Sequence, residues 1–120
     1  LVVFGSDWFV SSGNPLLGIE TAITRRDPLT NASAPFLDHQ RIGLRAALKA
    51  YTLNSAYINF IEHETGSIEV GKQADLTVLD KNLFDLKSSE ISEASVLLTL
   101  IDGERVYGEW SLAPLGKTAL

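Results

Sequence analysis

The first apolar stretch is the unbroken run LVVF at residues 1–4, which is followed by Gly5, Ser6 and Asp7. A strand buried on both faces of a parallel sheet has such a continuous apolar pattern, whereas a strand with one solvated face alternates. The pattern therefore predicts a buried parallel strand over residues 1–4. In α/β barrels and open α/β sheets the chemistry lies at the C-terminal strand ends, so we expect Asp7 to reach a cleft.

The next stretch has helical spacing. Asn14 and Pro15 are typical of a helix N-cap and first helical position, and the helix should end before Pro28. Arg25 and Arg26 are expected in its last turn, where cations suit the helix dipole. The apolar positions that predict this helix are Leu16, Leu17, Ile19, Ala22 and Ile23.

Helical spacing resumes near Ile42 and continues to Thr52. We expect Asn54 to cap a second short helix over residues 55–61, and Gly66 to end the helical pair. The inward positions are predicted to be Leu44, Ala47, Leu48 and Tyr51 in the first helix, and Ala56, Phe60 and Ile61 in the second.

The spacing of the apolar residues then changes from that of helices to that of strands, over residues 74–80 and 96–101. Asp102 and Gly103 follow, and then residues 104–107. An Asp-Gly pair between apolar runs is a strong hairpin signal, because a type I′ turn needs positive φ at both central positions.

The pattern divides the chain into residues 1–66, of α/β character, residues 67–110, mostly strand, and a weakly patterned tail at 111–120. The chain opens on Leu1 within the predicted strand and contains no Met. A lone parallel strand also leaves its backbone groups unpaired. We therefore expect the chain to be a C-terminal piece of a larger enzyme.

Composition narrows the function classes. The chain is 45% hydrophobic and 21% charged, which excludes a disordered tail. Its formal net charge of −5 argues against nucleic acid as a partner, and its apolar runs are too short for a membrane helix. The absence of Cys excludes disulfides and thiolate zinc sites. No secretory signal is visible, and the cytoplasm is the expected location.

Asp7 is the leading candidate for chemistry, although its position is equally compatible with a residue that only caps a turn. Trp8 could form the wall of a substrate cleft or could pack in the core, and both readings stay open. A nucleophilic Ser6 is poorly supported, since no His follows in the local pattern.

Two further patterns favour structural roles. His39 and His63 lie on different predicted elements without ligand spacing, so the chain should not complete a metal site from its own residues. Residues 66–73 match GxxxxGK, but Gln73 replaces the Ser or Thr of a P-loop, and a strand follows where a helix should. We expect a turn there, with Gly66 and Gly71 supplying unusual φ values.

Three stretches carry a family resemblance: FGSDW at residues 4–8, RIGLRAALKAYTLNSA at 41–56 and GSIEVGKQADLTVL at 66–79. Together they resemble the C-terminal part of the metal-dependent amidohydrolase superfamily, and most closely its amidohydrolase 3 branch, which includes N-substituted formamide deformylases. The hairpin at 101–107 resembles the closing strand pair of that family.

The resemblance implies an α/β fold, in which residues 1–4 are the last strand of a TIM-like barrel, helices pack outside it, and later strands join a small β-sandwich. The isolated chain would be an α+β fragment. Asp7 would be both a ligand of a divalent metal, expected to be zinc, and the general base on metal-bound water. Most metal ligands would precede residue 1.

The implied activity is hydrolysis of a non-peptide C–N bond in a small amide or formamide, with Trp8 touching the substrate. The chain alone is expected to be inactive and to pair with the missing barrel portion. The alternative is a non-catalytic module that self-associates or binds a partner through open strand edges.

Overall fold

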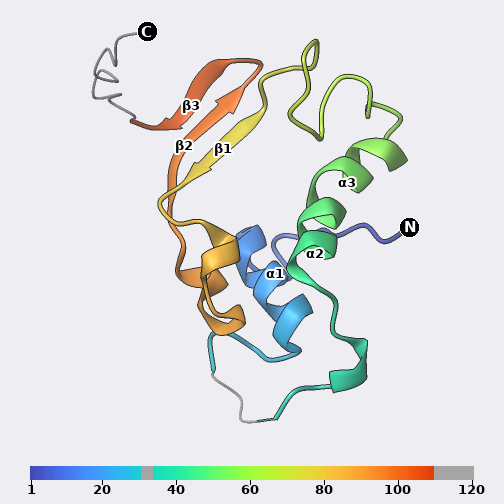
Figure 1. The fold of residues 1–120 in the computed structure, drawn as a ribbon, viewed down its shortest axis with the longest axis vertical. Helices are drawn as coiled ribbons and strands as arrows, with labels where there is room; N and C mark the ends of the chain where they lie inside the picture. The colour runs from blue at the N-terminus through green and yellow to red at the C-terminus, as the bar shows by residue number, and fades with distance from the viewer. Residues whose placement is uncertain (31–33, 110–120) are drawn as a thin grey trace, which may run out of the picture.

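The computed structural model describes residues 1–30 and 34–109 (Figure 1). Three α-helices, three 3-10 helices and a three-stranded antiparallel sheet of order β1-β2-β3 make up this part of the chain, as expected for an α+β fragment. The tail predicted at 111–120 lies outside the described residues. The elements are α1 (Pro15–Thr24), η1 (Asp38–Gln40), α2 (Leu44–Tyr51), α3 (Leu53–Ile58), β1 (Leu76–Leu79), η2 (Leu83–Asp85), η3 (Ser88–Glu93), β2 (Val96–Ile101) and β3 (Glu104–Gly108).

Helix α1 begins as predicted and ends earlier. The Asn14 side chain accepts a hydrogen bond from the Leu16 N–H at 3.0 Å, with Pro15 in the first helical position. Arg25 adopts a left-handed conformation, with φ of 56°, and caps the C-terminus. Arg25 and Arg26 therefore lie beyond the last turn rather than within it. The Thr24 hydroxyl stabilises this helix C-terminus, because it accepts a hydrogen bond from the Arg26 N–H at 3.2 Å.

The second helical region is also divided differently from the prediction. Thr52 breaks the helix with φ of −118° and ψ of −97°, so α3 begins at once and Asn54 lies inside it instead of capping it. Ala56 is buried as expected. Phe60 and Ile61 are exposed because α3 ends at Ile58 and Phe60 turns the chain with φ of 61°.

The strand predicted over residues 1–4 is wrong for this chain. The segment has no regular secondary structure and pairs with no strand among the described residues. It lies beside the second helical region instead, where Phe4 N–H donates to the Ala50 carbonyl at 3.1 Å. An apolar run becomes a strand only when a neighbour satisfies its backbone groups, and pattern alone does not supply that neighbour.

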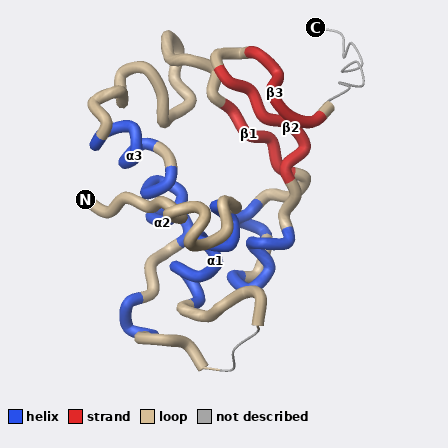
Figure 2. Tube along the Cα trace, turned by 180° about the vertical axis from the view of Figure 1, so that it is seen from behind, coloured by secondary structure: helices blue, strands red, loops and turns tan. Residues whose placement is uncertain are grey.

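The sheet confirms the predicted hairpin. Asp102 and Gly103 have φ of 50° and 80°, so both central turn residues are left-handed. The antiparallel register shifts between Thr99 and Leu100 opposite β3. Seen from behind, the sheet lies in the upper part of the molecule, and α1 lies among the helices below it (Figure 2).

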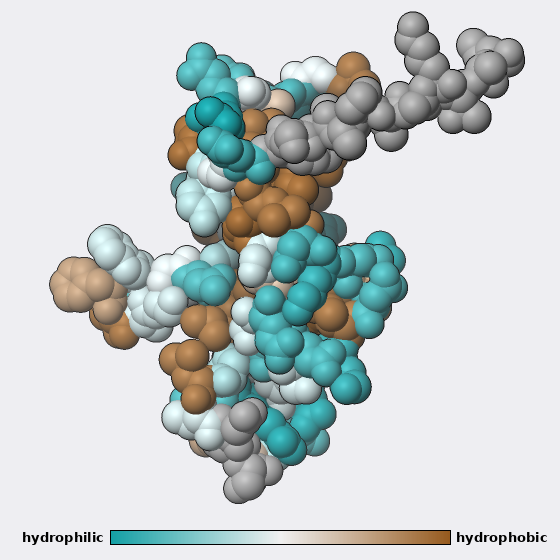
Figure 3. Space-filling view, turned by 90° about the vertical axis from the view of Figure 1, so that its left-hand side faces the viewer, coloured by the Kyte–Doolittle hydropathy of each residue, from teal (hydrophilic) through white to brown (hydrophobic). Residues whose placement is uncertain are grey.

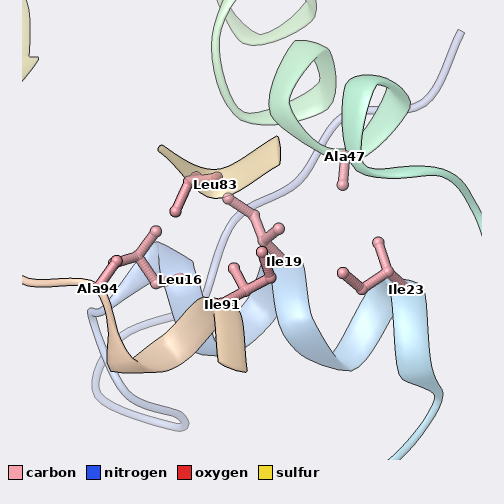
Figure 4. Close-up of a cluster of buried hydrophobic side chains, with 7 residues drawn as sticks. All are labelled: Leu16, Ile19, Ile23, Ala47, Leu83, Ile91 and Ala94. Atoms are coloured by element: carbon pink, nitrogen blue, oxygen red, sulfur yellow. The ribbon is translucent and has the colours of Figure 1, made fainter. Parts of the chain in front are cut away.

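The core is built on α1 (Figure 4). Leu16, Ile19 and Ile23 recur at helical spacing on one face of α1, and they meet Ala47 of α2 and Ile91 of η3. Burying a side chain of this size contributes roughly 1.5–3 kcal/mol, so this stripe is a large part of the hydrophobic stabilisation. Leu83 and Ala94 complete the cluster.

A buried carboxylate reinforces the same junction. Glu20 of α1 is only 4% exposed, and its Oε2 accepts a hydrogen bond from Ser92 N–H of η3 at 2.8 Å. Burying a charge is costly unless it is hydrogen-bonded. The bond therefore ties the helical part to the segment that leads into β2, across 72 residues of sequence.

The sheet, by contrast, is sparsely covered by the described residues. Leu98 of the central strand is buried, whereas large apolar side chains elsewhere in the sheet remain exposed. Apolar residues accordingly gather on the surface over the sheet (Figure 3). The exposed members are Leu97, Ile101, Val106 and Tyr107.

Asp75 fastens the hairpin to the chain that precedes the sheet. Its two carboxylate oxygens accept from Asp102 N–H and from the Thr65 hydroxyl, each at 2.8 Å. The hydrogen bond from the Asp102 backbone, followed by that from Thr65, holds the pKa of Asp75 below its ordinary value. The ionised carboxylate is therefore the form that stabilises this junction.

We expect Asp75→Asn to lower the midpoint of urea unfolding at pH 7. Because the folded-state pKa of Asp75 is depressed, its contribution is present above the unfolded value of about 3.9 and is lost as pH falls through the folded value. The difference in unfolding midpoint between the variant and the unsubstituted chain should therefore shrink below about pH 4. Asp102→Asn, which keeps the donating backbone N–H, is the control. An equal deficit at pH 7 and pH 2 would contradict this assignment.

Candidate functional site

The Asp7 loop, residues 5–13, connects the N-terminal segment to α1. Within it, the Ser11 hydroxyl donates to the Ser6 carbonyl, and Val10 N–H donates to the Asp7 carbonyl at 2.7 Å. Asp7 has φ of 49°, a left-handed conformation that Asp tolerates better than most residues. The backbone of Asp7 therefore forms a turn, as one of the two readings of the sequence proposed.

The Asp7 side chain remains available for chemistry. It is exposed, and no hydrogen bond or ion pair engages its carboxylate within residues 1–30 and 34–109. A free carboxylate at a loop tip can accept a proton or contribute one ligand to a cation. The geometry is thus compatible with both the turn-forming and the catalytic reading of Asp7.

Trp8 and Phe9 project from the same loop. Their rings meet edge to face, with centroids 6.1 Å apart, and the Trp8 side chain is 74% exposed. Trp8 therefore does not pack in a core formed by the described residues. A substrate-facing role for Trp8 stays a prediction.

A groove of about 430 Å³ lies between this loop, α1 and α2. Ser6 and Ser11 contribute to it from the loop, Gly18 from α1 and Tyr51 from α2, whereas Asp7 and Trp8 are not part of its wall. The predicted catalytic carboxylate of Asp7 therefore does not line this groove.

Tyr51 forms part of this groove wall. Its ring contacts the Phe4 ring edge to face, with centroids 5.4 Å apart. Its hydroxyl lies over Gly18 of α1, so close that a Cβ on Gly18 would clash with the oxygen. Burial raises the pKa of the Tyr51 phenol, which therefore stays protonated at neutral pH.

The described residues do not by themselves fit a divalent metal. They contain no group of three or more His, Asp or Glu side chains close enough to hold an ion. His39 and His63 are both exposed, and His63 Nε2 faces Glu64 Oε1 at 3.3 Å. Asp7 would thus be at most one ligand of a site completed by other residues.

The GxxxxGK stretch forms a turn, as expected. Gly66 and Gly71 have φ of 91° and 96°, which Gly adopts readily. The Lys72 ammonium is used within the turn, 2.6 Å from the Ser67 hydroxyl and 3.2 Å from Glu69 Oε1. A lysine engaged in this way is not presented to a phosphate.

A family model described as "Amidohydrolase family" matches residues 1–107, which include the Asp7 loop, the helices and the sheet. The chain belongs to the amidohydrolase family. The amidohydrolase family resemblance predicted from three sequence stretches is therefore confirmed.

Three curated relatives match this amidohydrolase chain over most of its length. "Protein LONG AFTER FAR-RED 3" of Arabidopsis thaliana is 38% identical over 107 residues, 89% of this chain and 18% of that protein. "N-substituted formamide deformylase" of Arthrobacter pascens is 36% identical over 88% of this chain and 19% of that protein. "Putative amidohydrolase YtcJ" of Bacillus subtilis is 31% identical over 86% of this chain and 20% of that protein.

The chain thus spans about a fifth of the length of these relatives. No solved structure matches the chain. Within the described residues, no helix is long and apolar enough to cross a membrane.

Sequence reasoning missed the structural roles of two residues, Asp75 and Gly18. Asp75 was quoted only as part of a motif, yet it binds the hairpin turn. Gly18 lies inside the predicted helix after Pro15, and it admits the Tyr51 hydroxyl. A Gly inside an apolar helical pattern was the available signal, because Gly there is unfavourable by about 1 kcal/mol and usually has a packing reason.

We expect Gly18→Ala to destabilise the chain despite its better helix propensity. The gain in helix propensity is about 1 kcal/mol, whereas overpacking costs about 1–3 kcal/mol. Because the new Cβ would clash with the Tyr51 hydroxyl, we expect a cost near the upper end of that range. The double variant Gly18→Ala/Tyr51→Phe should recover part of the loss, since the nearest remaining ring carbon is 3.1 Å away. Thermal unfolding of both variants and of Tyr51→Phe alone measures this coupling, and simple additivity would rule it out.

Proposed function

We propose that this chain is the C-terminal part of a metal-dependent hydrolase that cleaves non-peptide C–N bonds in small amides or formamides. The observation that carries the proposal is the amidohydrolase match across residues 1–107, which includes the loop bearing Asp7. A relative named N-substituted formamide deformylase supports the choice of bond. The proposal keeps the cytoplasmic location expected from the sequence.

Asp7 is the proton acceptor in this proposal. Hydrolysis of an amide adds water to the carbonyl carbon, and the water must lose a proton as it adds. The exposed Asp7 carboxylate takes that proton and returns it to the nitrogen as the C–N bond breaks, so the carboxylate is regenerated. The side chain is available for this because the described residues leave it without a hydrogen-bonding partner.

The divalent metal, zinc in this proposal, would need ligands from outside the described residues, because these supply Asp7 alone. Hydrolysis is therefore proposed for the whole enzyme and not for these 120 residues by themselves. The substrate, a small amide, would meet Trp8 beside the carboxylate. In the whole enzyme, residues 1–4 would gain the strand neighbours that the described residues lack and would form the eighth strand of a TIM-like barrel. Strands β1, β2 and β3 would belong to a small β-sandwich.

A second candidate is a non-catalytic module that self-associates or binds a partner. Large apolar side chains exposed near the N-terminus favour this reading, because contiguous exposed apolar surface marks interaction sites. The sheet has open edges at β1 and β3 among the described strands. The exposed N-terminal side chains are Leu1, Val2, Trp8, Phe9 and Val10.

We expect Asp7→Asn in the whole enzyme to lower kcat for amide hydrolysis by about 10²–10⁴-fold, the usual contribution of a positioned general base. Asp38→Asn, which removes an exposed carboxylate paired with Arg41, should leave kcat unchanged. The purified 120-residue chain should show no hydrolysis. Full activity of the whole enzyme carrying Asp7→Asn, or robust turnover by the chain alone, would refute the proposal.

The module reading predicts self-association of the isolated chain. Light scattering should give a mass above the 13.1 kDa of the monomer, and the mass should fall when Phe9 and Val10 are both replaced by Ser. Phe36→Ser, another exposed apolar position away from this loop, is the control. A well-folded monomer at high concentration would count against this second function.

A further inference from the structure

The Asp7 loop is held at both of its ends by side chains from one short stretch, residues 51–54. Among the described residues the loop itself makes only local bonds: Ser11 donates to Ser6, Val10 to Asp7, and the Asn14 N–H to the Ser12 hydroxyl. Such bonds fix the shape of a loop but not its direction relative to the rest of the molecule. The direction must therefore come from the two segments that the loop connects.

The first end is the N-terminal segment. Asn54 Nδ2 donates to the Val2 carbonyl at 2.7 Å, and Phe4 N–H donates to the Ala50 carbonyl at 3.1 Å. The Tyr51 ring meets the Phe4 ring edge to face. Three contacts thus hold a segment that has no strand partner among the described residues.

The second end is α1, which begins directly after the loop. The Tyr51 hydroxyl lies against Gly18 on this helix, where only a residue without a side chain leaves room. The α1 helix is further fixed against α2 by the contact of Ile23 and Ile19 with the cluster that includes Ala47. Tyr51 therefore touches the segment before the loop and the helix after it.

We propose that Tyr51 and Asn54 are positioning residues that set the direction of the Asp7 loop from both ends. The inference rests on the proposed role of Asp7 in hydrolysis. Catalytic side chains on loops depend on a rigid scaffold beneath them, and a misplacement of about 1 Å can cost about 10²-fold in rate. Asn54 and Tyr51 act on the reaction only through the loop, since neither lies at the Asp7 carboxylate.

The test compares Asn54→Ala with Asn59→Ala. Each variant removes one side-chain amide that donates to a backbone carbonyl, Asn54 to Val2 and Asn59 to Ser55. Only Asn54 reaches the N-terminal segment. Hydrogen exchange of the Phe4 amide, measured by NMR on the 120-residue chain, reports whether that segment opens.

Asn54→Ala should speed exchange of the Phe4 amide by about fivefold, because the Val2 and Phe4 bonds must open together and one typical hydrogen bond is lost. Asn59→Ala should leave it unchanged. The amide of Leu98, buried in β2, is the internal reference and should not respond in either variant. Unchanged Phe4 exchange in Asn54→Ala, or the same increase in both variants, would overturn the proposal.

If Asn54→Ala unfolds the chain, Asn54→Asp takes its place in the same comparison of Phe4 and Leu98 amide exchange. It keeps the shape of the side chain and replaces the donor by an acceptor that repels the Val2 carbonyl. Faster exchange at Phe4 with a constant rate at Leu98 supports the proposal, and no difference overturns it.

Kinetics of the whole enzyme separate this inference from the proposed function. Asn54→Ala should lower kcat by about tenfold or more with KM unchanged, since the loop is misdirected while substrate contacts persist. Faster Phe4 exchange with unchanged kcat, in an enzyme that Asp7→Asn inactivates, would overturn the positioning role. Unchanged kcat in both the Asn54→Ala and the Asp7→Asn enzymes would instead remove Asp7 from the chemistry. Unchanged exchange of the Phe4 amide in Asn54→Ala would overturn this inference, whatever the activity of the Asp7 variant.

Discussion

The burial of the apolar face of α1 is the constraint on which the rest of this structure depends. Leu16, Ile19 and Ile23 pack against α2 on one side and against η3 on the other, so that helix joins segments far apart in the sequence. Glu20 adds a hydrogen bond to η3 from within the same buried surface. Without this packing, the sheet and the helices would have little to hold them together, because few other described contacts connect them.

The candidate site is a consequence of that packing. The Asp7 loop extends from α1 on one side and from an unpaired N-terminal segment on the other, and Tyr51 contacts both. The loop places its carboxylate in solvent and leaves the neighbouring groove to Ser6, Ser11 and Tyr51. In the proposed function, the Asp7 carboxylate would act together with residues that lie outside the described part of the chain.

Several groups of the chain have no partner of the kind that they require among the described residues. Among the described residues, the N-terminal apolar run has no ladder partner, much of the sheet surface is apolar and exposed, and the carboxylates and imidazoles form no metal cluster. The chain spans about a fifth of each relative's length. The backbone groups of a strand need a neighbouring strand to bond with, and a metal ion needs several ligands.

The local elements and the family could be predicted from the sequence, because they depend on residues close together in the chain. The Asn14 cap, the β2 strand and the Asp102-Gly103 turn follow from local conformational preferences. Only the tertiary structure decided that residues 1–4 stay unpaired, that Asp75 binds the hairpin and that Gly18 admits the Tyr51 hydroxyl. These outcomes depend on which distant groups meet, and apolar periodicity carries no information on that.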